Sequence, residues 1–231
     1  MLRWVHIAAA SIALIAAAFA LAAPKGSPRH RRAGLVFAAA MATMTGSAVI
    51  LAGFVHPNRG NVVAALVTFY LVATGFLTVR RDVAASRGWH IALMLLGLGA
   101  GLRALSLGML AVRDGSVDHF PAAPFFLFAL IAVSGALLDT RLLMAGHIEG
   151  AQRLVRHLWR MGVASWIAFA SFFFGQAKFF PSGNRESGVL AVPVLLVTGT
   201  VLYWLVRTLW RGRKAARVRR AEVSAPSAGI Q

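Results

Sequence analysis

Seven long apolar blocks, separated by short polar connections, constrain the fold of this chain more than any other feature of its sequence. Each block has about 18 to 23 residues, the length at which a helix crosses a hydrocarbon core of roughly 30 Å. The blocks are residues 4–23, 34–55, 61–79, 90–112, 121–138, 159–177 and 188–206. The sequence therefore predicts an all-α, polytopic transmembrane helix bundle, with residues 1–206 forming a single seven-span domain.

The composition agrees with a chain that meets lipid. Of its 231 residues 58% are hydrophobic and only 13% are charged, whereas a soluble domain has about 25% charged residues. A net charge of +17 would suggest nucleic acid in a soluble protein. Here the positive charges lie in short clusters between apolar blocks, which predicts the bilayer as partner, with anionic lipids at the cytoplasmic face and no nucleic acid. The absence of cysteine excludes disulfides and thiolate sites.

The distribution of Lys and Arg predicts the orientation. One side of the membrane collects 18 of these residues, in the first, third and fifth connections and the C-terminal segment, and the other side collects five. Since short cytoplasmic loops retain positive charge, the N-terminus is expected outside and the C-terminus inside. Residues 207–231 are expected to form a basic, disordered cytoplasmic tail. The Ala20-Leu21-Ala22 triplet resembles a signal-peptidase site, but the basic first loop favours a retained first span.

Two further patterns concern helix packing. Gly97, Gly99 and Gly101 form a small-residue stripe of the kind that lets helices approach closely in lipid. The basic segment 149–159 predicts an interfacial helix that precedes the sixth span. In this interpretation Arg156 and Arg160 belong to the fifth connection.

Arg103 is the only ionisable side chain that these boundaries place deep within a span. It lies 13 residues beyond His90, roughly 20 Å along a helix. A charge near the bilayer centre costs at least about 2.5 to 3.5 kcal/mol. Its side chain is expected either to snorkel and bond backbone carbonyls, or to belong to a functional polar site.

Further polar side chains fall in the same outer half of the predicted bundle. They are His6, His56, Ser106, Ser171 and Gln176. Together with Arg103 they predict an outer-half polar cavity that binds a small anionic or quinone-like ligand.

Two alternatives remain open. One is a haem- or quinone-linked membrane redox protein. A haem b would need two imidazoles on different helices at matching depth, for which His6 and His56 qualify on the outer side, and His90 and His157 on the inner side. A small transporter could be built from inverted repeats, with spans one to three and four to six as the two copies. Because no nucleotide loop, metalloprotease motif or nucleophile elbow is present, the sequence predicts no catalytic residue and no metal ligand, and favours a protein that is not an enzyme.

Several short motifs are spread over most of the chain. They are His6-Ile7-Ala8, Lys25-Gly26, His30-Arg31-Arg32-x-Gly34-x-x-Phe37, Ala40-Met41, Gly60-Asn61, Asp139-x-Arg141, Arg156-His157-Leu158-Trp159-Arg160-Met161 and Ser171-Phe172-Phe173-x-Gly175-Gln176. In these motifs the chain resembles an uncharacterised family of bacterial multi-pass membrane proteins, classed as a domain of unknown function. The resemblance implies a helical fold in the bacterial cell inner membrane, and it implies no catalytic role for any residue.

Overall fold

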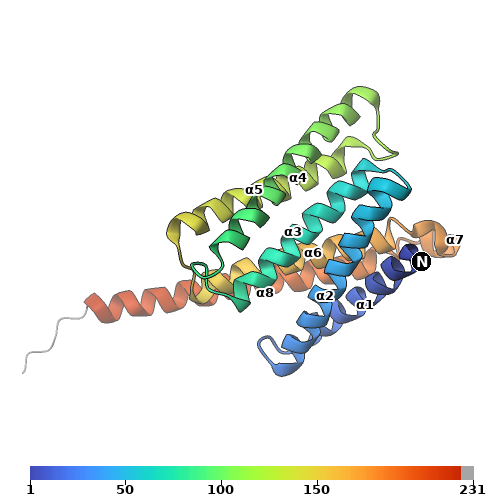
Figure 1. The fold of residues 1–231 in the computed structure, drawn as a ribbon. Helices are drawn as coiled ribbons and strands as arrows, with labels where there is room; N and C mark the ends of the chain where they lie inside the picture. Colours follow the sequence, from blue (N-terminus) through green and yellow to red (C-terminus); the bar gives the residue numbers. More distant parts are fainter. Residues whose placement is uncertain (225–231) are drawn as a thin grey trace, which may run out of the picture.

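The computed structural model describes residues 1–224, and the surroundings of side chains for residues 1–214. This part of the chain is a bundle of long helices (Figure 1). In chain order the elements are α1 (Leu2–Ala22), α2 (Pro28–Ile50), the π-helical turn η1 (Leu51–Val55), α3 (Arg59–Arg80), α4 (Arg87–Asp114), α5 (Ala122–Ala145), α6 (Gly150–Phe173), the 3-10 turn η2 (Ala177–Phe179), α7 (Ser182–Glu186) and α8 (Ala191–Ser224). The predicted all-α fold is confirmed.

Six of the described helices are long and apolar enough to cross a membrane. They are α1, α2 together with η1, α3, α4, α5 and α8. Helix α6, which contains most of the predicted sixth span, is long enough with 24 residues. It is not among the six because the basic side chains in its first half lower its mean hydropathy. The structure thus supports a multi-pass membrane protein with six spans of clear membrane character.

Helix α3 lies at the centre of the bundle. It packs against α2, α4, α5 and α6, while α1 pairs with α2, α4 with α5 and α6 with α8. The chain runs up and down, so that its connections gather at two ends (Figure 1). We call the end that holds Met1 and the connections 56–58, 115–121 and 174–190 the N-terminal end. The opposite end, with the connections 23–27, 81–86 and 146–149, is the tail end.

The helix boundaries follow from local capping. The Ser27 side chain accepts a hydrogen bond from the backbone N–H of His30 at 3.2 Å, and Pro28 occupies the first helical position of α2. Asn58 caps α3 in the same way, through the N–H of Asn61 at 2.8 Å. At the end of α1 the Lys25 ammonium donates to the Leu21 carbonyl at 2.7 Å, which satisfies a terminal acceptor.

Two boundaries differ from those predicted. Helix α5 runs on to Ala145 and α6 begins at Gly150, so the expected interfacial helix 149–159 is instead the first part of α6. The prediction erred because it treated charge as a sign of a connection, whereas Arg156 and Arg160 are buried inside the bundle and share the Asp139 carboxylate. Helix α8 continues to Ser224 where a disordered tail was expected from residue 207. The tail's last residues, 225–231, lie outside the described part of the chain.

The Tyr70 ring fills the contact between α3 and its neighbours α4 and α5. It is fully buried, and glycines face it from both sides. A Cβ added to Gly97 would lie 2.8 Å from three ring atoms, and one added to Gly135 would lie 2.9 Å from the hydroxyl oxygen. The small-residue stripe of α4 is therefore used unevenly, because Gly97 contacts Tyr70 whereas Gly99 faces open space.

We expect Gly97→Ala to destabilise the bundle, since the new methyl group must displace a ring that has nowhere to move. Overpacking of this kind costs about 1 to 3 kcal/mol. Thermal unfolding of the purified protein in detergent measures the change.

Gly99→Ala is the matched control. It adds the same methyl group to the same helix but meets nothing within 4 Å, so the higher helix propensity of alanine should leave the melting temperature unchanged or higher. Equal losses in both variants would contradict the packing described for Tyr70.

Candidate functional site

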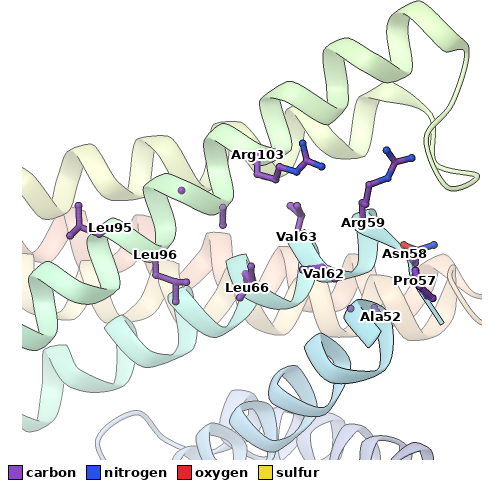
Figure 2. Close-up of a pocket in the computed structure, with 13 residues that line it drawn as sticks. Ala52, Pro57, Asn58, Arg59, Val62, Val63, Leu66, Leu95, Leu96 and Arg103 are labelled. Carbon is purple, nitrogen blue, oxygen red and sulfur yellow. The ribbon is translucent and has the colours of Figure 1, made fainter. Parts of the chain in front are cut away.

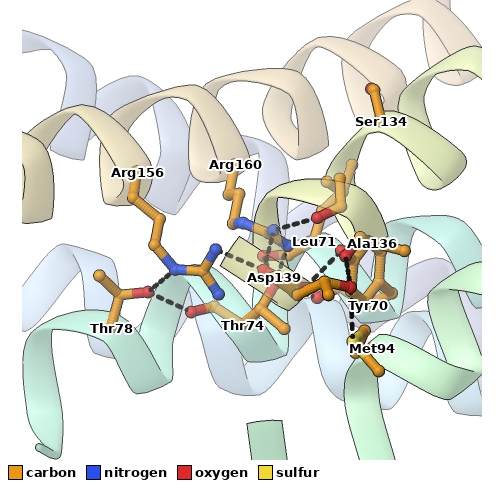
Figure 3. Close-up of polar contacts among 12 residues, drawn as sticks. Tyr70, Leu71, Thr74, Thr78, Met94, Ser134, Ala136, Asp139, Arg156 and Arg160 are labelled. Carbon is orange, nitrogen blue, oxygen red and sulfur yellow. Dashed lines mark hydrogen bonds and ion pairs between the residues drawn. The ribbon is translucent and has the colours of Figure 1, made fainter. Parts of the chain in front are cut away.

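A buried ionic cluster joins the three helices α3, α5 and α6 (Figure 3). At its centre is the Asp139 carboxylate of α5, which is 1% exposed. Its Oδ1 accepts hydrogen bonds from both Arg156 and Arg160 of α6, the latter at 2.5 Å. Its Oδ2 accepts from the Tyr70 hydroxyl of α3 at 2.6 Å. We call Asp139, Arg156, Arg160 and Tyr70 the Asp139 cluster.

Further acceptors around the two guanidinium groups come from α3 and α5. Arg160 donates to the Thr74 hydroxyl at 2.5 Å and to the Gly135 carbonyl at 3.1 Å. Its guanidinium also lies over the Tyr70 ring, 4.9 Å from the centroid, and over the neighbouring Trp159 ring at 4.7 Å. Arg156 donates to the Thr78 hydroxyl at 3.0 Å. These contacts replace the hydrogen bonds to water that each guanidinium loses when it is buried.

The Asp139 cluster corrects the expectation that Arg103 is the one ionisable side chain deep in the bundle. The sequence did contain a signal for it, because Arg153, Arg156, His157 and Arg160 share one helical face at spacings of three and four. That face is turned toward α3, where Arg153 donates to the Thr78 carbonyl at 2.7 Å and His157 contacts the Gly75 carbonyl at 2.9 Å. The sequence did not predict that this face is buried, because the segment was assigned to a connection between spans.

A large cavity of about 1690 Å³ opens near the N-terminal end of the bundle. It lies between α1, α2 and α3 on one side and α5, α6 and the segment 175–180 on the other. Most of its wall is apolar or aromatic. Its polar or charged lining residues are Arg3, His6, Ser11, Thr45, His56, Asn61, Thr68, Ser171, Gln176 and Lys178.

The charged residues that line this N-terminal cavity, among those described, are all basic. Arg3 and Lys178 line it, and none of the described residues in its wall is Asp or Glu. His6 Nδ1 lies 3.0 Å from the Met44 carbonyl oxygen, which can only accept a hydrogen bond. Donation to this carbonyl places the proton of the neutral ring on Nδ1, and the Ser47 hydroxyl lies 3.1 Å from the same nitrogen. The cavity thus offers two cations and one imidazole that is hydrogen-bonded to α2.

Arg103 lines a different cavity, of about 530 Å³, between α3 and α4 (Figure 2). We call this cavity the α3–α4 groove. Its side chain is exposed, and its nearest hydrogen-bonding partner is the Ser106 hydroxyl at 3.4 Å. Arg59 lines the same cavity but is engaged with Asp118, at 3.0 and 3.1 Å. That guanidinium holds the pKa of Asp118, in the connection between α4 and α5, below its usual range. Arg103 is thus the less constrained cation of this groove.

The predicted site residues are therefore divided between two cavities. His6, His56, Ser171 and Gln176 line the N-terminal cavity, whereas Arg103 lies in the α3–α4 groove with Ser106 as its hydrogen-bonding neighbour. Among the remaining histidines, His157 is held by the Gly75 carbonyl. His90 is buried on α4 with neither ring nitrogen hydrogen-bonded. The convergence of Arg103 with His6 and Gln176 that the sequence suggested does not occur.

We expect Asp139→Asn to destabilise the protein strongly, because it leaves two buried guanidinium groups without their counter-charge. Breaking a buried ion pair by removing one partner costs about 3 to 5 kcal/mol. Chemical or thermal unfolding in detergent, followed by tryptophan fluorescence, measures the loss.

Asp114→Asn provides the comparison, since Asp114 pairs with Arg113 in solvent at 2.7 Å. Exposed pairs contribute little to stability, so this variant should unfold like the wild type. If the two variants behaved alike, Asp139 would not hold the three helices together.

Comparisons of the chain with protein-family models, with curated proteins and with solved structures found no match.

Proposed function

We propose that the chain is a seven-span membrane protein that binds an anionic amphiphile, such as a lipid-like molecule with one acidic head group, in its N-terminal cavity. The observation that carries this proposal is the lining of the cavity, in which two cations and neutral polar groups accompany an apolar wall, with no acidic residue among the described residues that line it. Ligand sites are typically apolar, with a few polar groups that fix the orientation.

The shape of the N-terminal cavity favours an elongated ligand. Its wall along α1 extends from Met1 to Leu14, about 20 Å at 1.5 Å per residue. Arg3 and His6 lie at the start of this stretch, and Lys178 and Gln176 lie in the connection after α6, so the polar groups gather toward the N-terminal end. Seven aromatic residues line the remaining wall: Phe120, Phe125, Phe128, Trp166, Phe172, Phe179 and Phe180. An acidic head would meet the cations while the apolar part lies among these rings.

We further propose that α6 is the seventh span and that the tail end faces the cytoplasm of a bacterium, in its inner membrane. Burial of the basic face of α6 against α3 and α5 supports the crossing, because these charges need not meet lipid. Of the 18 basic residues counted for the inner side, Arg156 and Arg160 are buried, which still leaves a large excess over five. Beyond the apolar block that ends at residue 206, α8 carries described cations that suit an anionic lipid surface. They are Arg207, Arg211, Arg213 and Lys214.

Aromatic side chains near the helix ends support this placement. Trp4 at the N-terminal end and Trp89 at the tail end are 72% and 70% exposed. Trp204 on α8 lies under both Lys25, at 5.2 Å, and Arg207, at 5.1 Å. Tryptophan is enriched at both membrane interfaces, so these rings mark the expected boundaries.

Reporter fusions test the orientation. A fusion after Gly212 should be active in the cytoplasm, and a fusion in the connection 115–121 should be active only outside it, because the Lys and Arg excess retains the tail end inside. The reversed pattern at either position would contradict the seven-span topology.

Hexadecyl phosphate serves as the probe for the N-terminal cavity. Added to the protein in dodecyl maltoside, it should raise the melting temperature by preferential binding to the folded state. Arg3→Gln and Lys178→Gln should each weaken the apparent affinity about tenfold, which corresponds to about 1.4 kcal/mol. Arg29→Gln, which removes an exposed charge at the tail end, should bind like the wild type.

Two outcomes would redirect the proposal. Equal stabilisation by uncharged hexadecanol or decyl-ubiquinone, unaffected by Arg3→Gln, would favour a quinone-like ligand over an anionic one. A Soret band at about 400 to 430 nm in the purified protein would favour the haem alternative. His6 and His56, two of the candidate haem ligands, line the same cavity.

A further inference from the structure

The buried polar atoms without a partner are concentrated in one place. In the part of the chain whose side chains are described, four buried side-chain nitrogen or oxygen atoms lack a hydrogen bond. They are both ring nitrogens of His90, Nη2 of Arg156 and Nε of Arg160. Since most buried polar atoms in proteins have a partner, four unpaired nitrogens around one cluster call for an explanation.

His90 lies next to the Asp139 cluster. One helical turn before it, Arg87 of α4 donates to the Leu143 carbonyl of α5 at 2.9 Å. One turn after it, Met94 accepts from the Thr140 hydroxyl at 3.4 Å. His90 therefore stands at the level of α5 that carries Asp139.

The charges of the cluster do not cancel. Two guanidinium groups, 6% and 0% exposed, share one carboxylate. One positive charge is left over in a region of low dielectric, where an unpaired charge is expensive. Each unpaired guanidinium nitrogen is a hydrogen-bond donor, and His90 carries at least one more N–H. A neutral acceptor would satisfy these donors but would leave the excess charge, whereas an anion satisfies both.

We propose that the Asp139 cluster and His90 form a binding site for one small monovalent anion of chloride size. The number of free donors indicates the class of anion. Arg156 and Arg160 each retain only one unpaired nitrogen, so neither can present the paired N–H groups that bind a carboxylate or phosphate in bidentate fashion. A compact anion needs only one N–H from each side chain, and its single charge matches the excess.

The site is expected to fill from the tail end. Arg156 is six residues from the start of α6, about 9 Å along the helix, and the basic connections at this end attract anions. The site shares no residue with the N-terminal cavity and lies toward the other end of the bundle. Failure of one proposal therefore leaves the other untouched.

The test replaces sodium gluconate with sodium chloride at constant ionic strength and follows the melting temperature of the full chain in detergent. Binding to the folded state should raise it saturably, by about 3 to 6 °C at ten times the dissociation constant. Arg156→Gln removes the excess charge and should abolish the chloride effect. Arg141→Gln, which removes an exposed charge two residues from Asp139, should retain it.

A second variant keeps the test decisive if Arg156→Gln fails to fold. His90→Leu removes the unpaired ring nitrogens without touching the ion pairs, and it should raise the chloride concentration for half-effect about tenfold. The proposal is overturned if chloride has no saturable effect, or if wild type and His90→Leu respond equally. A larger rise with sulfate that is the same in every variant would also overturn it, because exclusion of salt from the surface acts that way.

Iodide gives an independent readout on the unmodified protein. Since the Trp159 ring lies 4.7 Å from the Arg160 guanidinium carbon, an iodide ion bound in the site should quench its fluorescence saturably, and chloride should reverse the quenching. The saturable component should disappear in Trp159→Phe. Purely linear quenching in the wild type, as in free solution, would contradict an anion at this position.

Discussion

The Asp139 carboxylate is shared by two buried arginines, and the rest of the bundle depends on this arrangement. Arg156 and Arg160 make α6 too polar to cross a membrane on its own hydropathy. Their hydrogen bonds to Asp139 and to the Thr74 and Thr78 hydroxyls connect α6 with α5 and α3 (Figure 3). The free energy of the ion pairs is offset by desolvation, so the cluster is better understood as a determinant of which helices meet than as a source of large net stability.

Close packing around the cluster depends on small side chains opposite a large one. Tyr70 reaches Asp139 only because Gly97 and Gly135 leave room for its ring. Thr74 and Thr78 add hydroxyls that accept from the arginines while donating to carbonyls one turn earlier on α3, each at 2.6 Å. Helix α3 thereby hydrogen-bonds its neighbours without exposing a polar group to lipid, which suits its central position.

The two ends of the bundle have different chemistry. The N-terminal end holds a wide, mostly apolar cavity that is lined by the cations Arg3 and Lys178. The tail end holds a buried ionic cluster and basic connections. We therefore propose different ligands for the two ends, a long amphiphile for the N-terminal cavity and a compact anion for the Asp139 cluster. The Arg103 groove belongs to neither, and the exposed position of Arg103 beside Ser106 agrees with a side chain that extends toward the nearer interface.

The sequence by itself determined the all-α class, the positions of most long helices and the gathering of His6, His56, Ser171 and Gln176 in one half of the bundle, because hydropathy and length act locally. It could not determine whether Arg156 and Arg160 face water or protein, since that depends on Asp139 arriving from another helix. Nor could it separate Arg103 from Gln176, because helix rotation is set by packing, as at Gly97 against Tyr70. Only the tertiary structure decided which charges are paired, since a buried charge is tolerated only where distant segments supply its partner.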